Sequence, residues 1–291
     1  MPDDDKYPTE SGRRRFVRGV VGAAALSSVG TGAAAAITTT TQQTGAGGGL
    51  TRFMGIRNTE GPAPRGMPLI PIEVESDGRI RGVWPEVTPE NVGGREVMVA
   101  RTEDFKGTGV TYTNEWFQYC GVQTYAGLQP EADQDNYFRA TSSPPESYEW
   151  QTETYDAGDV LNAEDFLDYE EFTTGLGDPG YGKAAMGTWR SQDVGSTMPV
   201  QVLRSPKVQE MRETAEGPTG EFVRAATTES GFVAWLDKCS HFCCVPAFNA
   251  YSDASKFGGD NRVYCQCHQS VYDPFDVVEE SFIALPRPEA E

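Results

Sequence analysis

The cysteines and histidines of this chain are concentrated in one short window near its C-terminal end. Five of the six cysteines and both histidines lie between residues 239 and 268 of a sequence of 291 residues. Scattered composition does not produce such a coincidence, so we interpret the window as a site. Any fold that this chain adopts must bring the two ends of the window together.

The window contains two loops, each placed directly after a predicted strand. They read Cys239-Ser240-His241-Phe242-Cys243-Cys244 and Cys265-Gln266-Cys267-His268-Gln269-Ser270. Each loop offers one thiolate and one imidazole, so two loops clasped together give a Cys2His2 ligand set. That set suits either a zinc ion or a [2Fe-2S] cluster with cysteines on one iron and histidines on the other.

Two further cysteines help to distinguish a zinc site from a [2Fe-2S] site. Cys244 follows His241 by three residues and Cys267 directly precedes His268, so a clasp of the loops also brings these two thiols together. A Cys244–Cys267 disulfide would close a loop of about 22 residues and contribute roughly 3 kcal/mol to stability. Such a bond requires an oxidising compartment, and a zinc site has no need of it.

The spacing of these residues resembles a known signature. Cys-x-His-x-x-Cys followed by Cys-x-Cys-His-x-Ser is similar to the pattern of the Rieske iron–sulfur family, and Cys244-Val245-Pro246 extends the similarity. The chain looks most like the Rieske subunit of cytochrome bc-type quinol oxidoreductases, of a haloarchaeal kind. The resemblance covers residues 199–291 and implies an antiparallel β fold with a two-loop subdomain that binds one [2Fe-2S] cluster. It does not cover residues 50–198.

The resemblance also implies a role for each ligand. Cys239 and Cys265 would bind the inner iron, and His241 and His268 would bind the outer, solvent-facing iron.

Two residues that follow the second histidine match positions that tune the cluster in the family. Ser270 matches a serine whose hydroxyl bonds a bridging sulfide, and Tyr272 matches a tyrosine that bonds a ligand cysteine sulfur. Both bonds would draw negative charge off the cluster, stabilise its reduced form and favour a high reduction potential. The alternative is that Ser270 and Tyr272 are an ordinary turn residue and an ordinary core residue.

The sequence departs from the family pattern in three places. Cys243 and Gln269 replace glycines, so the loop tips must either adopt compatible backbone angles or shift. The run 285–288, Leu-Pro-Arg-Pro, stands where the family has a proline-rich loop that shields the cluster. The closing strand that follows this loop in the family is not found after it, so we expect the residues before 199 to supply a substitute.

Cys120 and Cys243 are left over from this scheme. The simpler interpretation is that Cys120 is a small buried apolar residue and Cys243 a tolerated thiol. The alternative is a second disulfide that joins the preceding segment to the tip of the first loop.

The N-terminal region resembles a twin-arginine (Tat) export signal. Arg13-Arg14-Arg15-Phe16 precedes an uncharged run over residues 19–37, which as a helix would measure roughly 28 Å, about the thickness of a bilayer core. We favour a retained transmembrane anchor over a signal cleaved after Ala34-Ala35-Ala36. The arginines then place the N-terminus in the cytoplasm and the rest on the outer face of the cell membrane.

The rest of the chain predicts a mainly β protein. Short alternating runs bounded by turn residues indicate strands at 69–74 and 97–100, then at 200–203, 222–226, 232–236, 262–264 and 282–285. Residues 165–172 predict a short acidic helix. We therefore divide the chain into a cytoplasmic tail 1–18, a transmembrane or signal segment 19–37, a flexible tether 38–49, a β-rich extension 50–198 of unknown role and a Rieske domain 199–291.

The function that follows is electron transfer out of a membrane quinol. The expected partners are quinol, a cytochrome b-type membrane subunit, and a cytochrome or blue-copper acceptor, so the chain would be the electron-transfer subunit of a quinol oxidoreductase. The formal charge of −19 excludes nucleic acid as a partner and is typical of proteins kept soluble in high salt. Alternatives are the Rieske small subunit of an arsenite oxidase-like molybdoenzyme and a structural zinc module. An oxygenase would need further histidine ligands, which the sequence lacks.

Overall fold

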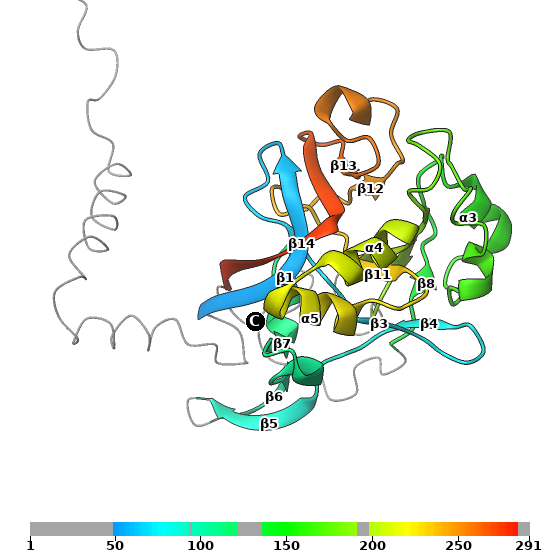
Figure 1. Ribbon diagram of the computed structural model, residues 1–291. Coiled ribbons are helices and arrows are strands. Elements are labelled where there is room, and N and C mark those ends of the chain that lie inside the picture. Colours follow the sequence, from blue (N-terminus) through cyan, green and yellow to red (C-terminus); the bar gives the residue numbers. More distant parts are fainter. Residues whose placement is uncertain (1–48, 93–94, 121–135, 191–197, 285–291) are drawn as a thin grey trace, which may run out of the picture. The chain divides into compact units, whose positions relative to one another are not determined.

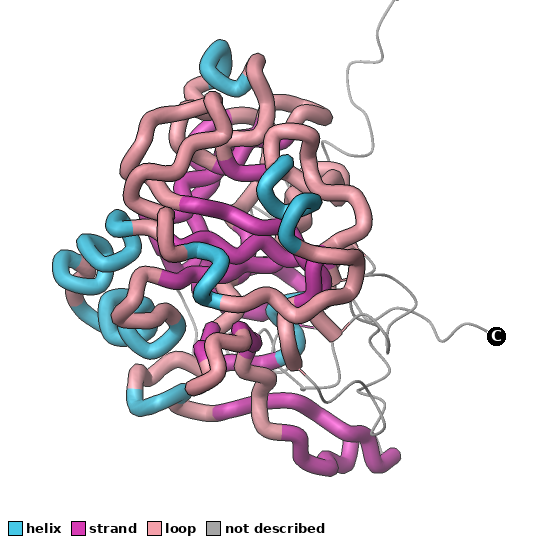
Figure 2. The backbone as a smooth tube through the Cα atoms, turned by 90° about the vertical axis from the view of Figure 1, so that its right-hand side faces the viewer, coloured by secondary structure: helices cyan, strands magenta, loops and turns pink. Residues whose placement is uncertain are grey.

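The computed structural model describes residues 49–92, 95–120, 136–190 and 198–284. The twin-arginine motif, the apolar run 19–37, almost all of the tether and the proline-rich run 285–288 lie outside these ranges. Within the described ranges, no helix combines the length and the apolar character that a membrane span requires. Strands and loops outweigh helices, as Figure 2 shows, so the predicted mainly β class is confirmed.

The largest sheet joins the first and last described strands. Its order is β12 (Ala247–Phe248), β13 (Val263–Cys265), β14 (Ser270–Ala284), β1 (Gly49–Glu60) and β2 (Met67–Pro68). β1 and β14 run antiparallel side by side, with Leu50 opposite Ile283 near one end and Glu60 opposite Val271 at the other (Figure 1). A strand from the residues before 199 thus pairs with the last described strand of the chain.

A second sheet has the order β11 (Phe232–Leu236), β10 (Pro199–Arg204), β9 (Lys183–Thr188) and β8 (Arg139–Ala140). The strands predicted at 200–203 and 232–236 are confirmed as β10 and β11, whose apolar side chains are buried. β9 pairs with β10 along its whole length, from Pro199 opposite Thr188 to Arg204 opposite Lys183. Strands from both sides of residue 198 thus share two sheets, and the predicted boundary there does not separate two structural units.

Two smaller sheets complete the β structure. One contains β3 (Ile72–Val74) and β4 (Ile80–Gly82), and the other contains β5 (Val87–Val92), β6 (Arg95–Thr102) and β7 (Tyr112–Thr113). The strands predicted at 69–74 and 97–100 fall on β3 and β6. Four short 3-10 helices cover Phe105–Gly107, Asn114–Phe117, Ala163–Phe166 and Ala254–Phe257. The acidic helix predicted at 165–172 is only the end of the third, followed by turns.

The α-helices of the described residues are α3 (Glu149–Thr154), α4 (Pro206–Thr214) and α5 (Gly217–Ala226), and the last two contact β14. The strand predicted at 222–226 is wrong, because these residues form the second half of α5. Phe222, Val223 and Ala226 are buried at a spacing of one and four residues, which is one face of a helix. Over five residues that spacing is not distinguishable from a buried strand.

A cluster of aromatic side chains connects the segment before Cys120 to α5. Trp116 lies 5.0 Å from the ring of Tyr112 and 5.6 Å from that of Phe222, measured between ring centroids. All three side chains are buried. This packing anchors the 3-10 helix Asn114–Phe117 and so fixes where the chain leads on to Tyr119 and Cys120.

Candidate metal centre

The two cysteine and histidine loops begin where buried strands end. Loop one, residues 239–246, connects β11 to β12, and loop two, residues 265–270, is the tight connection between β13 and β14. Backbone hydrogen bonds close both loops: the Cys239 N–H donates to the Cys244 carbonyl at 2.8 Å, and the Gln269 N–H donates to the Cys265 carbonyl at 2.9 Å. The strands therefore present the two loops as preformed turns.

Both loop tips have the left-handed backbone that usually requires glycine. Cys243 has φ of 63° and Gln269 has φ of 57°. An L-residue in this region pays a conformational cost that glycine avoids. Of the two outcomes left open by the sequence, the tips keep the glycine-like conformation, and the surrounding contacts must hold it.

Four of the six cysteines form two disulfides. The expected Cys244–Cys267 bond is present and connects the two loops. A second bond joins Cys120 to Cys243, so the simpler interpretation of these two cysteines as unpaired residues is wrong and the alternative holds. The sequence could not decide this because the partners are 123 residues apart.

Cys239 and Cys265 are the only free cysteines, and each is 1% exposed. The two thiols hydrogen-bond one another, which lowers the pKa of Cys239 to about 5 because Cys265 donates to it, with Tyr272 and backbone N–H groups of loop one adding to the effect. The pKa of Cys265 is raised, first by this same contact and then by burial. Both sulfurs can act as thiolate ligands once they are deprotonated.

The imidazoles of His241 and His268 meet at the same place. Their ring centroids lie 4.7 Å apart, and the ring of Phe242 lies 4.5 Å from His241 and 5.0 Å from His268. His268 is exposed, and Phe242 is 66% exposed. Nδ1 of His241 is buried and has no hydrogen-bond partner among the described residues. A buried nitrogen without a partner is costly unless something binds it, so this atom is a candidate ligand.

Tyr272 and Ser270, for which the family resemblance predicted contacts with the cluster and its ligands, are both fully buried. The Tyr272 hydroxyl donates to Sγ of Cys239 at 3.1 Å. Ser270 is fully buried, and its Oγ accepts the Ala63 N–H at 3.1 Å, which leaves its own proton for another acceptor. Tyr272 therefore contacts a candidate ligand directly, and Ser270 keeps a donor for the interior of the site.

A proline-rich segment that sequence reasoning missed packs against both loops. This segment, residues 61–65, reads Gly-Pro-Ala-Pro-Arg and connects β1 to β2. Ala63 bonds Ser270 as above, and the Ser240 hydroxyl donates to the Arg65 carbonyl at 2.6 Å. Gly61 approaches loop two so closely that a Cβ would lie 2.4 Å from the Gln269 carbonyl oxygen. The only local signal was a run of turn residues, and nothing in it indicates a partner 200 positions away.

The donor set of the described site is two sulfurs and at least two imidazole nitrogens. By the type of its donor atoms, this set suits a [2Fe-2S] cluster of mixed cysteine and histidine ligation or a zinc ion. A second sulfur group, formed by Cys244, Cys265 and Cys267, has its atoms within 4.8 Å of one another. Two of its members form a disulfide and cannot supply thiolates, so this group does not make a separate metal site.

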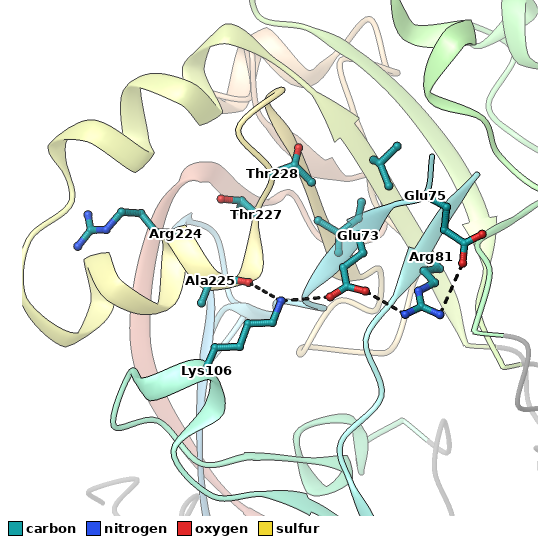
Figure 3. A pocket seen from close by; sticks show the side chains of 10 residues that line it. Glu73, Glu75, Arg81, Lys106, Arg224, Ala225, Thr227 and Thr228 are labelled. Atoms are coloured by element: carbon teal, nitrogen blue, oxygen red, sulfur yellow. Dashed lines mark hydrogen bonds and ion pairs between the residues drawn. The ribbon is translucent and has the colours of Figure 1, made fainter. Parts of the chain in front are cut away.

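A hollow of about 550 Å³, apart from the loops, lies beside β3 and α5 (Figure 3). Its charged groups pair with one another: Lys106 contacts Glu73 at 3.2 Å, and Arg81 contacts Glu73 at 3.0 Å and Glu75 at 3.6 Å. These side chains already satisfy one another, so the hollow is less suited than the loops to hold a cofactor.

No protein-family model, curated protein or solved structure matches this chain.

Proposed function

We propose that this chain is a Rieske-type electron-transfer protein that holds one [2Fe-2S] cluster on Cys239, His241, Cys265 and His268. The observation that carries the proposal is which cysteines are disulfide-bonded and which two remain free beside the histidines. Disulfides take up every cysteine except Cys239 and Cys265, which are buried and hydrogen-bonded to one another. Cys239 also accepts the backbone N–H of His241, and Cys265 that of His268. A structural zinc module would use the same four ligands. It would not require a tyrosine hydroxyl bonded to a ligand sulfur, or an imidazole exposed at a loop tip.

The residues of the site have distinct parts in this function. The bound cluster would supply one-electron redox chemistry. Cys239 and Cys265 would hold the inner iron, and His241 and His268 the outer one. Donation from Tyr272 to the sulfur of Cys239, and from the free hydroxyl proton of Ser270, would stabilise the negative charge added on reduction.

The imidazoles of the half-buried His241 and the exposed His268 suit a donor that releases protons together with electrons. An imidazole that binds metal through Nδ1 keeps Nε2 for a hydrogen bond to a quinol hydroxyl, and it can take up that proton as negative charge arrives behind it. The exposed ring of Phe242 beside both imidazoles offers an apolar contact for a quinol ring. Quinol as donor, a cytochrome b-type membrane subunit and a cytochrome or blue-copper acceptor are the partners we propose.

Purification in mild detergent tests the partner assignment. We expect the chain to be recovered from membranes with a cytochrome b-type subunit and to be reduced when a quinol is added. Recovery with a molybdenum-containing large subunit would instead support the arsenite oxidase-like alternative. Recovery as a chain that no quinol reduces, although its cluster is loaded, would contradict the proposed donor.

Replacing Tyr272 by phenylalanine is expected to lower the equilibrium constant for reduction about tenfold, or by roughly 59 mV, because one hydrogen bond to a charged sulfur is lost. Redox titration followed by EPR measures this. Tyr264→Phe is the matched control, since the Tyr264 hydroxyl bonds Asp253 and not a cysteine sulfur. An unchanged potential in Tyr272→Phe would show that the bond does not act on the cluster.

A further inference from the structure

Arg65 carries a positive charge beside loop one. Its guanidinium lies between two aromatic rings, with Cζ 4.9 Å from the ring centroid of Tyr119 and 4.5 Å from that of Phe282. Its Nε is buried and has no hydrogen-bond partner among the described residues. The backbone of Arg65 is fixed as well, because its carbonyl accepts the hydroxyl of Ser240, the neighbour of Cys239. The cation is therefore held in one place.

The aromatic partner of Arg65 is itself tied to loop one. The hydroxyl of Tyr119 donates to the Lys238 carbonyl at 2.8 Å, one residue before Cys239. The next residue, Cys120, forms the disulfide with Cys243 at the loop tip. Arg65 thus belongs to a layer of contacts that holds the segment from Lys238 to Cys243.

Few other charges lie close to this layer. The two loops, residues 239–246 and 265–270, contain no acidic or basic side chain apart from their two histidines. Glu280 interacts electrostatically with Arg65, and its carboxylate accepts the Gly66 N–H at 2.6 Å. Asp237, two residues before Cys239, is fully buried. Lys238 is the remaining nearby cation, and it is more exposed to water than Asp237.

Burial lowers the pKa of Arg65, while Tyr119, Glu280 and Tyr272 favour its charged form. An arginine keeps its charge under such a shift. Tyr272, which interacts electrostatically with Arg65, bonds Sγ of Cys239, so the charge of Arg65 acts on a residue that contacts a candidate ligand. Because the guanidinium is partly shielded from water by two rings, salt screens it less than it screens exposed charges.

We propose that Arg65 is a residue that raises the reduction potential of the cluster, by holding a positive charge next to loop one where it stabilises the electron added on reduction. This inference rests on the proposed function and deepens it. It assigns to the segment between β1 and β2 an electrostatic task in addition to its packing against the loops. Glu280 opposes this effect, because its negative charge lies close to Arg65.

The test is a redox titration, followed by EPR, of the cluster in the full-length protein purified in detergent. Arg65→Met removes the charge and keeps the apolar stem, while Arg65→Lys keeps the charge. Glu280→Gln removes the opposing charge. Arg79→Met is a control for net charge, because Arg79 lies on the turn between β3 and β4 and pairs with Glu75 and Asp77.

Arg65→Met is expected to lower the equilibrium constant for reduction on the order of tenfold, about 59 mV for a one-electron couple, at both low and high salt. Arg65→Lys should remain near the wild-type value, and Glu280→Gln should shift the potential upward. Arg79→Met should leave it unchanged.

Iron and sulfide content is measured first, so that the two ideas fail separately. A wild-type protein without a cluster contradicts the proposed function itself. A loaded Arg65→Met protein with the wild-type potential, or an equal shift in Arg79→Met, overturns the role of Arg65 and leaves the cluster assignment standing. If Arg65→Met does not fold, Glu280→Gln decides, because an unchanged potential in that variant contradicts the proposal.

Discussion

A His241→Asn variant is expected to retain neither iron nor acid-labile sulfide above about a tenth of the wild-type content. The cluster needs four protein ligands, and an amide is a poor substitute for the buried Nδ1 that has no other partner. Iron and sulfide analysis of the purified variant measures the loss directly, and it does not depend on any assay of electron transfer.

Gln266→Asn is the matched control for this experiment. Gln266 is an exposed residue of loop two between Cys265 and Cys267, and the change also places an asparagine in a cluster loop. This control should keep its full cluster content. A His241→Asn protein with full iron and sulfide content would mean that His241 is not a ligand. The proposed set of four Rieske ligands would then be wrong.

Removal of the Cys120–Cys243 disulfide by a double change to serine is expected to lower the free energy of unfolding by about 4–5 kcal/mol, because the bond closes a very long loop. For a protein of this size that corresponds to a fall in melting temperature of roughly 10 °C or more. The bond also holds Cys243 in its left-handed conformation, so the loss should be accompanied by weaker retention of the cluster.

Thermal unfolding without reductant, followed by circular dichroism, measures this effect. The comparison is a double change to serine at Cys244 and Cys267, which opens a loop of about 22 residues and should cost roughly 3 kcal/mol. The chain-entropy account thus predicts the larger loss for the longer loop. Equal melting temperatures for the wild type and the Cys120/Cys243 variant would contradict a stabilising role of this bond.

The features that the sequence predicted correctly are those determined by residues close to one another in the sequence. Strands such as β10 and β11 are short runs of buried apolar residues, and the two loops carry their cysteines and histidines in sequence order. The Cys244–Cys267 bond was predictable because both cysteines lie within three residues of a candidate ligand. These inferences needed no knowledge of the rest of the chain.

The features that the sequence did not predict depend on long-range pairing. The identity of β1 as the partner of β14, the packing of residues 61–65 against the loops, and the choice of Cys120 as partner of Cys243 all join positions more than 100 residues apart. No local propensity selects such partners. The strand prediction for 222–226 failed for a different reason. Over five residues, the burial pattern suits the period of a helix as well as that of a strand.

These long-range contacts explain why the extension belongs to the site. The end of β1 pairs with β14 beside loop two, the segment 61–65 bonds both loops, and Tyr119 bonds Lys238 just before loop one. The family resemblance nevertheless begins only at residue 199. The extension therefore closes the fold around the candidate centre and is not a separate module.

The most direct test of the central claim is iron and acid-labile sulfide analysis of the anaerobically purified protein, combined with EPR after reduction. The account predicts two irons and two sulfides for each chain, and an EPR signal that appears only in the reduced state. A colourless protein that contains zinc and no labile sulfide, with the four candidate ligands intact, would contradict it.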